Sequence, residues 1–120
     1  MKTKVIKLTK FQLSKIRENF ESLKCCKNFY YVYESQTPNF VCVLLEGEMH
    51  VIKKRKKIEV INSGNLIGLE NLLKNKKFKS DIWVSPNSVL VLLGKTEIIQ
   101  ALKEKQCKLY HLIKEVFGEL

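Results

Sequence analysis

The residues best suited to metal or nucleophilic chemistry are few and scattered along this chain of 120 residues. The two histidines, His50 and His111, have no ligand-like neighbours, and the four cysteines form no Cys-x-x-Cys pair. Structural zinc sites are built from such closely spaced ligand pairs, so we expect no metal site. No Ser-His-Asp arrangement, paired-carboxylate site, P-loop or Rossmann fingerprint is recognisable either. We therefore expect a protein that is not an enzyme.

The cysteines and the apolar runs also bear on the compartment. Cys42 stands between two valines in an apolar run, which predicts a small core residue. Cys25 and Cys26 are adjacent, and nothing else in the sequence supports a redox role for them. No apolar run approaches the roughly 18 residues of a membrane helix, and the basic N-terminus lacks a signal-peptide core. These features predict a cytoplasmic protein without a membrane segment.

The charge is strongly basic, with 22 lysines and arginines against 12 acidic residues and a formal net charge of +10. The densest basic runs are 53–57 and 74–79, and only Arg17 and Arg55 are arginines. Two interpretations stay open: a solvated lysine-rich surface, or an electrostatic contact with an acidic partner. A nucleic-acid-binding protein using both runs is a further alternative. That alternative lacks a helix-turn-helix and an aromatic-plus-basic stacking surface.

The first element expected is a helix over 9–24. Thr9 and Gln12 have the spacing of a capping box, in which each side chain accepts a hydrogen bond from the other residue's backbone N–H. The apolar positions Ile16 and Phe20 lie on one face of that helix and predict packing against the rest of the fold.

Residues 28–93 alternate short apolar runs with turn residues, which is typical of a small all-β barrel. Phe40–Leu45 is a continuous apolar run and predicts a strand buried on both faces, while the basic run 53–57 predicts a hairpin tip. Helical spacing returns over 96–120. We expect one domain, 1–120, that is mainly β with flanking helices: a β-roll or jelly-roll barrel with an N-terminal helix and C-terminal helices.

Two segments together resemble the cyclic-nucleotide-binding domain family. The segment 43–51 (VLLEGEMHV) is similar to the family's apolar strand followed by x-Gly-x-apolar-x-Val. The segment 63–68 (SGNLIG) resembles its Pro-Gly-Asp-x-Phe-Gly corner, with Ser63 in place of the proline. The resemblance covers nearly the whole chain and implies a regulatory domain with a ligand pocket after Gly68. The implied ligand-binding residues are Gly68, Leu69, Glu70, Lys77, Lys79 and Ser80.

The chain departs from the family's phosphate-binding cassette at two positions. Leu69 occupies the place of the glutamate that holds the ribose, and Glu70 comes one residue late. Phe78 or Lys79 stands where the family has an arginine that holds the cyclic phosphate, and Lys79 is the better match. Loss of such a charged partner costs about 2–5 kcal/mol, roughly thirtyfold to several-thousandfold in affinity. The Gly-Leu-Glu version looks more like Fnr-type sensor domains of the Crp/Fnr regulators that do not use a cyclic nucleotide.

These departures predict a non-catalytic sensor or interaction module with weak or no binding of cAMP or cGMP. The main alternative is a true cyclic-nucleotide-binding regulatory domain, with cAMP or cGMP as ligand. A cupin-type enzyme would share the barrel but needs a His/Glu metal cluster, and His50 stands alone among the strands. The C-terminal apolar stripe predicts a homodimer or a protein partner, unless it folds back on the barrel. That stripe includes Leu109, Leu112, Ile113, Val116 and Phe117.

Overall fold

The computed structural model describes residues 3–27, 29–105, 110–111 and 114. The strand expected to be buried on both faces is β4 (Phe40–Glu46), which is buried from Val41 to Leu45, whereas Phe40 at its start is 46% exposed. The elements before it are β1 (Val5–Lys7), α1 (Lys10–Asn19), β2 (Leu23–Lys24) and β3 (Phe29–Val32). Those after it are β5 (Glu48–Lys53), β6 (Lys56–Asn62), β7 (Asn65–Ile67), α2 (Leu69–Lys74), β8 (Asp81–Val84), β9 (Val89–Gly94) and α3 (Lys95–Glu104).

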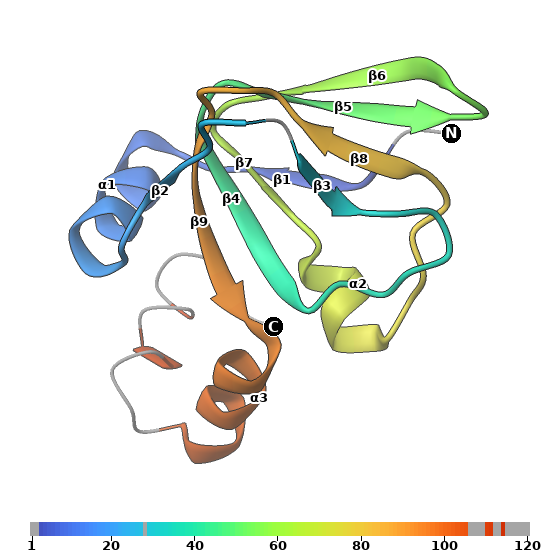
Figure 1. Cartoon of the computed structure of the whole chain (residues 1–120). Coiled ribbons are helices and arrows are strands. Elements are labelled where there is room, and N and C mark those ends of the chain that lie inside the picture. The colour runs from blue at the N-terminus through green and yellow to red at the C-terminus, as the bar shows by residue number, and fades with distance from the viewer. Residues whose placement is uncertain (1–2, 28, 106–109, 112–113, 115–120) are drawn as a thin grey trace.

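The strands form two antiparallel sheets that face each other (Figure 1). One has the order β1-β7-β4-β9-β2 and the other the order β3-β8-β5-β6. The two sheets, with α1 after β1 and α3 after β9, form the expected β-roll with flanking helices. The predicted fold class, mainly β, is therefore confirmed.

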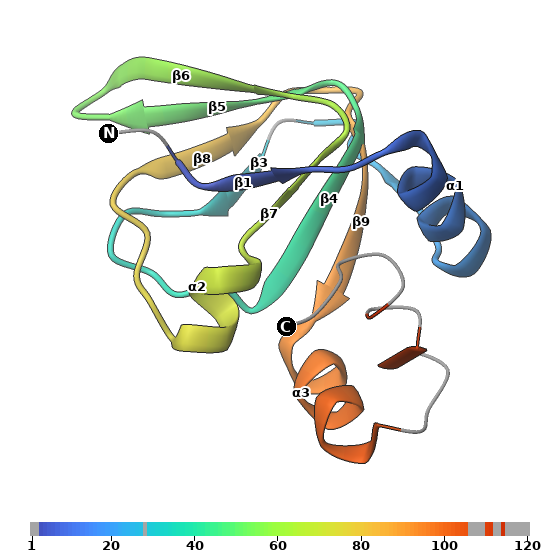
Figure 2. The same cartoon turned by 180° about the vertical axis from the view of Figure 1, so that it is seen from behind.

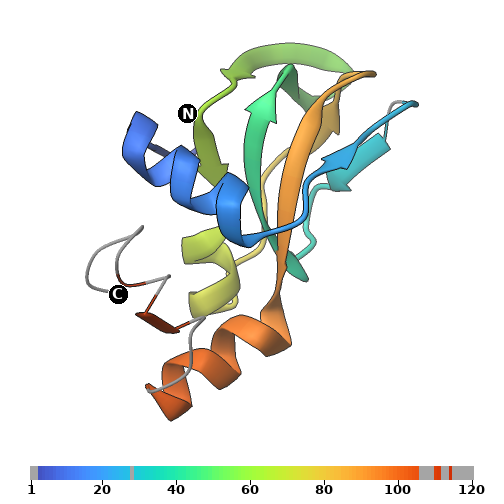
Figure 3. The same ribbon diagram turned by 90° about the vertical axis from the view of Figure 1, so that its left-hand side faces the viewer.

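Strand β4 separates two hydrophobic clusters because its successive side chains point to opposite faces. Cys42 and Leu44 pack between the sheets, together with Met49 of β5. Val41 and Val43 point the other way, into a cluster that also takes side chains from α1, α2 and α3. Figure 3 shows these three helices on one side of β4 and β9, with the second sheet on the other side.

The basic run 53–57 forms the tip of the β5–β6 hairpin, as the sequence predicted. Lys54 and Arg55 at the turn have positive φ angles of 52° and 66°. Positive φ at both central residues is the mark of a type I′ turn, whose twist suits the flanking strands. The hairpin therefore carries its charge at the far end of the four-stranded sheet.

The N-terminal region differs from the prediction in two ways. The Thr9–Gln12 capping box is present, but the helix expected over 9–24 ends at Asn19. Residues Leu23–Lys24 leave the helix to pair with β9 at one edge of the five-stranded sheet. The opposite edge is formed by β1, which was not predicted and which pairs with β7 (Figure 2). Backbone pairing with distant strands therefore overrides the local helical pattern after Asn19.

The C-terminal prediction is only partly covered by the described residues. Helix α3 starts at Lys95, and its Ile98 and Ala101 are buried in the helix-side cluster. The proposed interaction residues Leu109, Leu112, Ile113, Val116 and Phe117 lie outside the described residues. None of the helices in the described part of the chain has the length and apolar content that crossing a membrane requires.

Candidate functional site

A cavity of about 320 Å³ lies beside α2, within the size range of about 300–1,000 Å³ that is usual for ligand sites. Four segments contribute to it: the residues before β1, the β5–β6 hairpin, α2, and the loop from α2 to β8. The lining residues are Thr3, Lys4, Lys53, Ile58, Glu70, Asn71, Lys76, Lys77, Phe78, Lys79 and Ser80. The cavity thus brings together residues that are far apart in the sequence, from Thr3 to Ser80.

Four of the six ligand-binding residues predicted from the sequence line this cavity, namely Glu70, Lys77, Lys79 and Ser80. Gly68 and Leu69 do not line it. The Leu69 side chain is only 5% exposed and packs in the helix-side cluster. The position that the family resemblance assigns to a ribose-binding glutamate is therefore a core position in this chain.

Gly68 has a structural role, because it is the residue at which the chain turns into α2. Its φ angle is 94°, in the left-handed region that glycine adopts without steric cost. A Cβ atom at this position would collide with the hydroxyl of Tyr31. That hydroxyl donates a hydrogen bond to the Phe40 carbonyl, and burial raises the pKa of Tyr31. Gly68 therefore lets the corner pass close to Tyr31 and sets where α2 begins.

Glu70 is held by lysines on three sides. Its carboxylate lies 2.6 Å from Nζ of Lys4, 3.0 Å from Nζ of Lys76 and 3.5 Å from Nζ of Lys74. Hydrogen bonds from Lys4 first and Lys76 second lower the pKa of Glu70 from 4.5 to about 2. The carboxylate is therefore ionised throughout the neutral range, and its lone pairs are turned to protein cations.

The remaining charged wall of the cavity is made of lysines. Lys53 comes from the hairpin, while Lys77 and Lys79 come from the loop after α2. The same three lysines also line a second, more open hollow, which adds Lys54 and Arg55 from the hairpin tip. Two adjoining hollows thus share one lysine wall, which favours anions over cations.

The cavity also has an apolar wall. Phe78 is buried in the core between the sheets, where its ring meets Tyr31 edge to face at 6.0 Å. Ile58 of β6 leaves 50% of its surface exposed. Phe78, which competed with Lys79 for the arginine position, is therefore a core residue with one edge on the cavity, and Lys79 is the charged lining residue of the two. An apolar group of a ligand has a surface to pack on at this wall.

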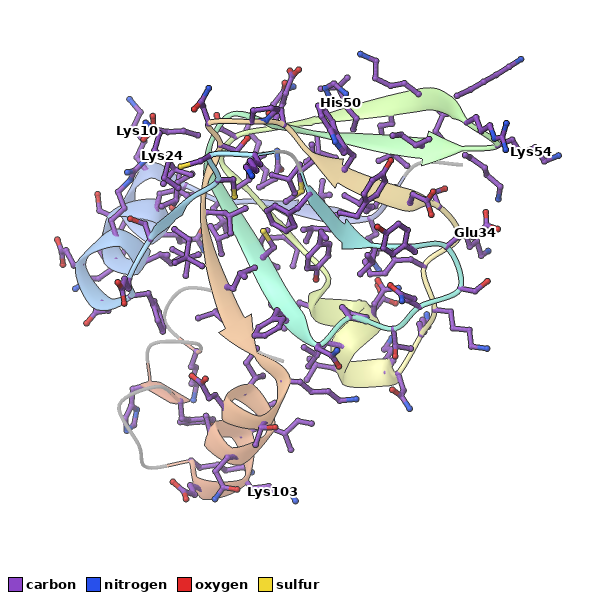
Figure 4. The ribbon with its side chains drawn as sticks, in the orientation of Figure 1. Lys10, Lys24, Glu34, His50, Lys54 and Lys103 are labelled. Atoms are coloured by element: carbon purple, nitrogen blue, oxygen red, sulfur yellow. The ribbon has the colours of Figure 1, made fainter. Side chains whose placement is uncertain are left out.

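A row of aromatic side chains, which the sequence analysis missed, crosses the outer face of the four-stranded sheet. Tyr30, Trp83 and His50 are direct cross-strand neighbours on β3, β8 and β5. The rings of His50 and Trp83 lie 4.7 Å apart, and Figure 4 shows His50 projecting from the sheet. Glu48, which contacts His50 at 2.8 Å, stands on the same face. Alternation along the three strands was the signal that could have revealed this row.

The cysteines are free thiols in the described part of the chain. Cys42 is fully buried, as its apolar neighbours predicted, whereas Cys26 is exposed and Cys25 is intermediate. Among the described residues, no group of three or more histidine, cysteine, aspartate or glutamate side chains is placed to hold a metal ion.

The comparisons with known proteins give a fold. No family model and no curated protein matches the sequence. Among solved structures, one from a cyclic-GMP-dependent signalling pathway of bacterial phytopathogenesis has a TM-score of 0.65 and 11% identity, with 91% of this chain and 90% of that chain covered. The Toxoplasma gondii protein kinase A regulatory domain with cAMP has a TM-score of 0.57 and 16% identity, covering 78% and 37%. A regulatory subunit of a cAMP-independent protein kinase A from Trypanosoma cruzi, bound to guanosine, has a TM-score of 0.58 and 13% identity, with 88% of this chain and 40% of that chain covered.

The fold follows from this likeness. The chain has the cyclic-nucleotide-binding domain fold, as the two sequence segments indicated. It spans less than half the length of the two kinase regulatory chains. The similar structures are mostly regulatory domains, and one is an EAL enzyme.

Proposed function

We propose that this chain is a non-catalytic regulatory module that senses a small anionic ligand in the cavity beside α2 and binds cAMP and cGMP weakly or not at all. The observation that carries this proposal is the state of Glu70. Its carboxylate is 2.6 Å from Lys4 and 3.0 Å from Lys76, so it is engaged by protein cations. A ribose hydroxyl would have to compete with both lysines.

The residue at the family's phosphate-binding position also supports weak binding of a cyclic nucleotide. Lys79 lines the cavity where the family resemblance places an arginine. An ammonium group is a hydrated point charge and lacks the planar pair of donors that grips a phosphate through two hydrogen bonds. Leu69 is buried and offers no polar atom. The cavity therefore keeps the charge needed to attract an anion and lacks two groups that recognise a cyclic nucleotide in the family.

Similar structures support a small ligand at this fold. The Toxoplasma gondii domain holds cAMP, and the Trypanosoma cruzi subunit, of a cAMP-independent kinase, holds guanosine. Ligands other than a cyclic nucleotide are thus compatible with the fold, and the altered cassette of this chain is consistent with such a change.

A ligand signal has a physical path toward the C-terminus. Leu69 and Leu72 of α2 share one hydrophobic cluster with Ile98 and Ala101 of α3. Because packed cores resist continuous deformation, a shift of α2 on ligand binding would displace α3 as well. We propose that the helical segment after Gly94 moves, and that it forms a homodimer or binds a protein partner through Leu109, Leu112, Ile113, Val116 and Phe117.

Calorimetry with cAMP and cGMP tests the ligand part of the proposal. We expect dissociation constants weaker than about 1 mM for both, with no shift in the melting temperature at lower concentrations. A dissociation constant in the micromolar range would show that Lys79 and the displaced Glu70 replace the usual groups, and the proposal would fall. Sedimentation of the wild type and of a Leu112→Ser variant tests the dimer.

A further inference from the structure

The charges that line the α2 cavity do not match a singly charged ligand. Its lining includes the five lysines Lys4, Lys53, Lys76, Lys77 and Lys79, and Glu70 is the one carboxylate among its described lining residues. Glu70 contacts Lys4 and Lys76. No carboxylate among the described residues forms an ion pair with Lys53 or Lys77. Over its described lining residues, the cavity therefore carries a formal surplus of four positive charges.

We propose that this cavity binds a small molecule that carries at least two phosphate groups, such as a non-cyclic nucleoside diphosphate or triphosphate. This inference rests on the proposed function, because it names the chemistry of the ligand sensed there. A cyclic phosphate carries one negative charge and would leave most of the lysine surplus unbalanced. A chain of phosphates supplies three or four charges along a short distance and can balance it.

The shape of the lysine wall supports an extended anion. Lys53, Lys77 and Lys79 lie between the cavity and the second hollow, which the hairpin-tip residues Lys54 and Arg55 also line. A phosphate chain that starts in the cavity can therefore continue along a surface on which basic side chains outnumber acidic ones. Glu34 and Asp81 also line the second hollow, where Oδ1 of Asp81 accepts a hydrogen bond from the Glu34 backbone N–H at 2.7 Å.

The apolar wall favours a nucleotide over inorganic polyphosphate. Ile58, half exposed, and Phe78 give a base or ribose a surface to pack on, beside the lysines that take the phosphates. A nucleic acid strand is disfavoured as the occupant. The aromatic row that would stack its bases lies on the outer sheet face, where Glu48 contacts His50, and none of its residues lines the cavity.

Calorimetry at low salt without divalent cations tests the proposal on the full chain. The probes are ATP, GTP, ADP, tripolyphosphate, adenosine, cAMP and a ten-nucleotide single-stranded DNA. We expect ATP or GTP to bind at least roughly thirtyfold more tightly than cAMP, and to weaken steeply as salt is added. Adenosine alone should not bind measurably. If tripolyphosphate binds as tightly as ATP, the cavity recognises the phosphates alone. If tripolyphosphate binds more weakly than ATP, the cavity recognises a nucleotide.

Matched variants locate the binding. We expect Lys53→Gln combined with Lys77→Gln to weaken ATP binding by roughly tenfold, because both lysines border the two hollows. The control combines Lys10→Gln with Lys103→Gln, which removes the same charge from helices away from the hairpin tip at Lys54 (Figure 4). The control should change affinity by less than roughly twofold. Melting curves of both variants confirm that they fold.

Three results would overturn this inference. The first is that ATP, GTP, ADP and tripolyphosphate all fail to bind at a concentration of about 1 mM. The second is an equal loss of ATP affinity in the control variant, and the third is tighter binding of the oligonucleotide than of ATP. The proposed function fails separately, through tight binding of cAMP or cGMP. Failure of every phosphate probe together with absent cAMP binding would therefore refute the polyphosphate ligand alone.

Discussion

Nζ of Lys4 lies 2.6 Å from Oε2 of Glu70, and this ion pair joins the residues before β1 to helix α2 at the cavity that both line. A second contact, from the Thr3 backbone N–H to Oε1 of Glu59 at 2.9 Å, ties the same segment to β6. The N-terminal segment is therefore a wall of the candidate site. Any ligand that reaches Glu70 has to share the cavity with Lys4.

Replacement of Glu70 should change how stability depends on pH. The pKa of Glu70 is lowered to about 2 in the folded chain, so its ion pairs stabilise the fold above pH 4.5 and are lost as the pH falls toward 2. We expect Glu70→Gln to lower stability at neutral pH and to flatten the loss of stability between pH 4.5 and 2. Melting temperatures across that range measure both effects.

The matched control for that experiment is Glu21→Gln, at an exposed position outside the cavity. It should leave the acid limb of the wild-type stability curve in place. If Glu21→Gln and Glu70→Gln flatten the curve equally, the lysines around Glu70 do not set its ionisation.

The two lysines nearest Glu70 should differ in their effect on it. The hydrogen bond from Lys4 is the first cause of the lowered pKa and that from Lys76 the second. We therefore expect Lys4→Met to raise the pKa of Glu70 more than Lys76→Met does. An NMR titration of the Glu70 side-chain carboxyl carbon measures both variants. An equal or larger shift in Lys76→Met would contradict the geometry at the N-terminal segment.

The sequence was sufficient wherever the signal is local. The Thr9–Gln12 capping box, the buried run, which starts at Val41 rather than Phe40, and the hairpin tip near Lys54 are all present, because each depends on neighbours a few residues away. The order of strands with the corner at Gly68 was enough to indicate the fold.

The parts that could not be predicted depend on distant partners. Strand β1 exists because it pairs with β7, and three residues from Val5 to Lys7 carry too short a pattern to signal that edge. The Lys4–Glu70 pair follows from β1 and was missed with it. Leu69 was assigned to the ligand site by its place after Gly68, but the side chain enters the core. A short helix can turn either face toward a ligand, and sequence spacing alone did not decide which.

Gly68 and Gly64 offer a test of the close approach at the corner. Both have positive φ, 94° and 88°, so an alanine at either position should cost about 1 kcal/mol in backbone strain. A Cβ at Gly64 meets open space apart from Leu13 at 3.9 Å, whereas one at Gly68 collides with the Tyr31 hydroxyl. We expect Gly68→Ala to destabilise the fold by about 2–4 kcal/mol in guanidinium unfolding.

The double variant separates strain from collision. Adding Tyr31→Phe to Gly68→Ala removes the colliding hydroxyl and should return part of the lost stability, although Tyr31→Phe alone is destabilising because the Phe40 carbonyl loses its donor. Equal losses for Gly64→Ala and Gly68→Ala would indicate backbone strain alone.

The thiols should react in the order of their burial. Cys26 is exposed, burial and the neighbouring Cys26 raise the pKa of Cys25, and burial raises the pKa of the fully buried Cys42. Because the thiolate is the reactive form, we expect iodoacetamide to modify Cys26 first among the three thiols that the structure describes, and Cys42 at least about 100-fold more slowly. Mass spectrometry of digested samples follows each site. Rapid labelling of Cys42 in the folded chain would contradict its place between the sheets.

The assignment of Leu69 to the core can be tested by restoring the family's glutamate. Leu69→Glu would place a carboxylate where the leucine side chain is 5% exposed, and we expect a loss of about 3 kcal/mol or more at pH 7. Burial raises the pKa of such a carboxylate above its unfolded value, so the penalty should shrink as the pH falls toward 4. Leu69→Met, the volume-conserving control, should cost less than about 1.5 kcal/mol and show no such pH dependence. If Leu69→Glu is instead nearly as stable as the wild type and gains cAMP binding in calorimetry, position 69 faces the ligand, and the altered cassette is one substitution away from the cyclic-nucleotide-binding form.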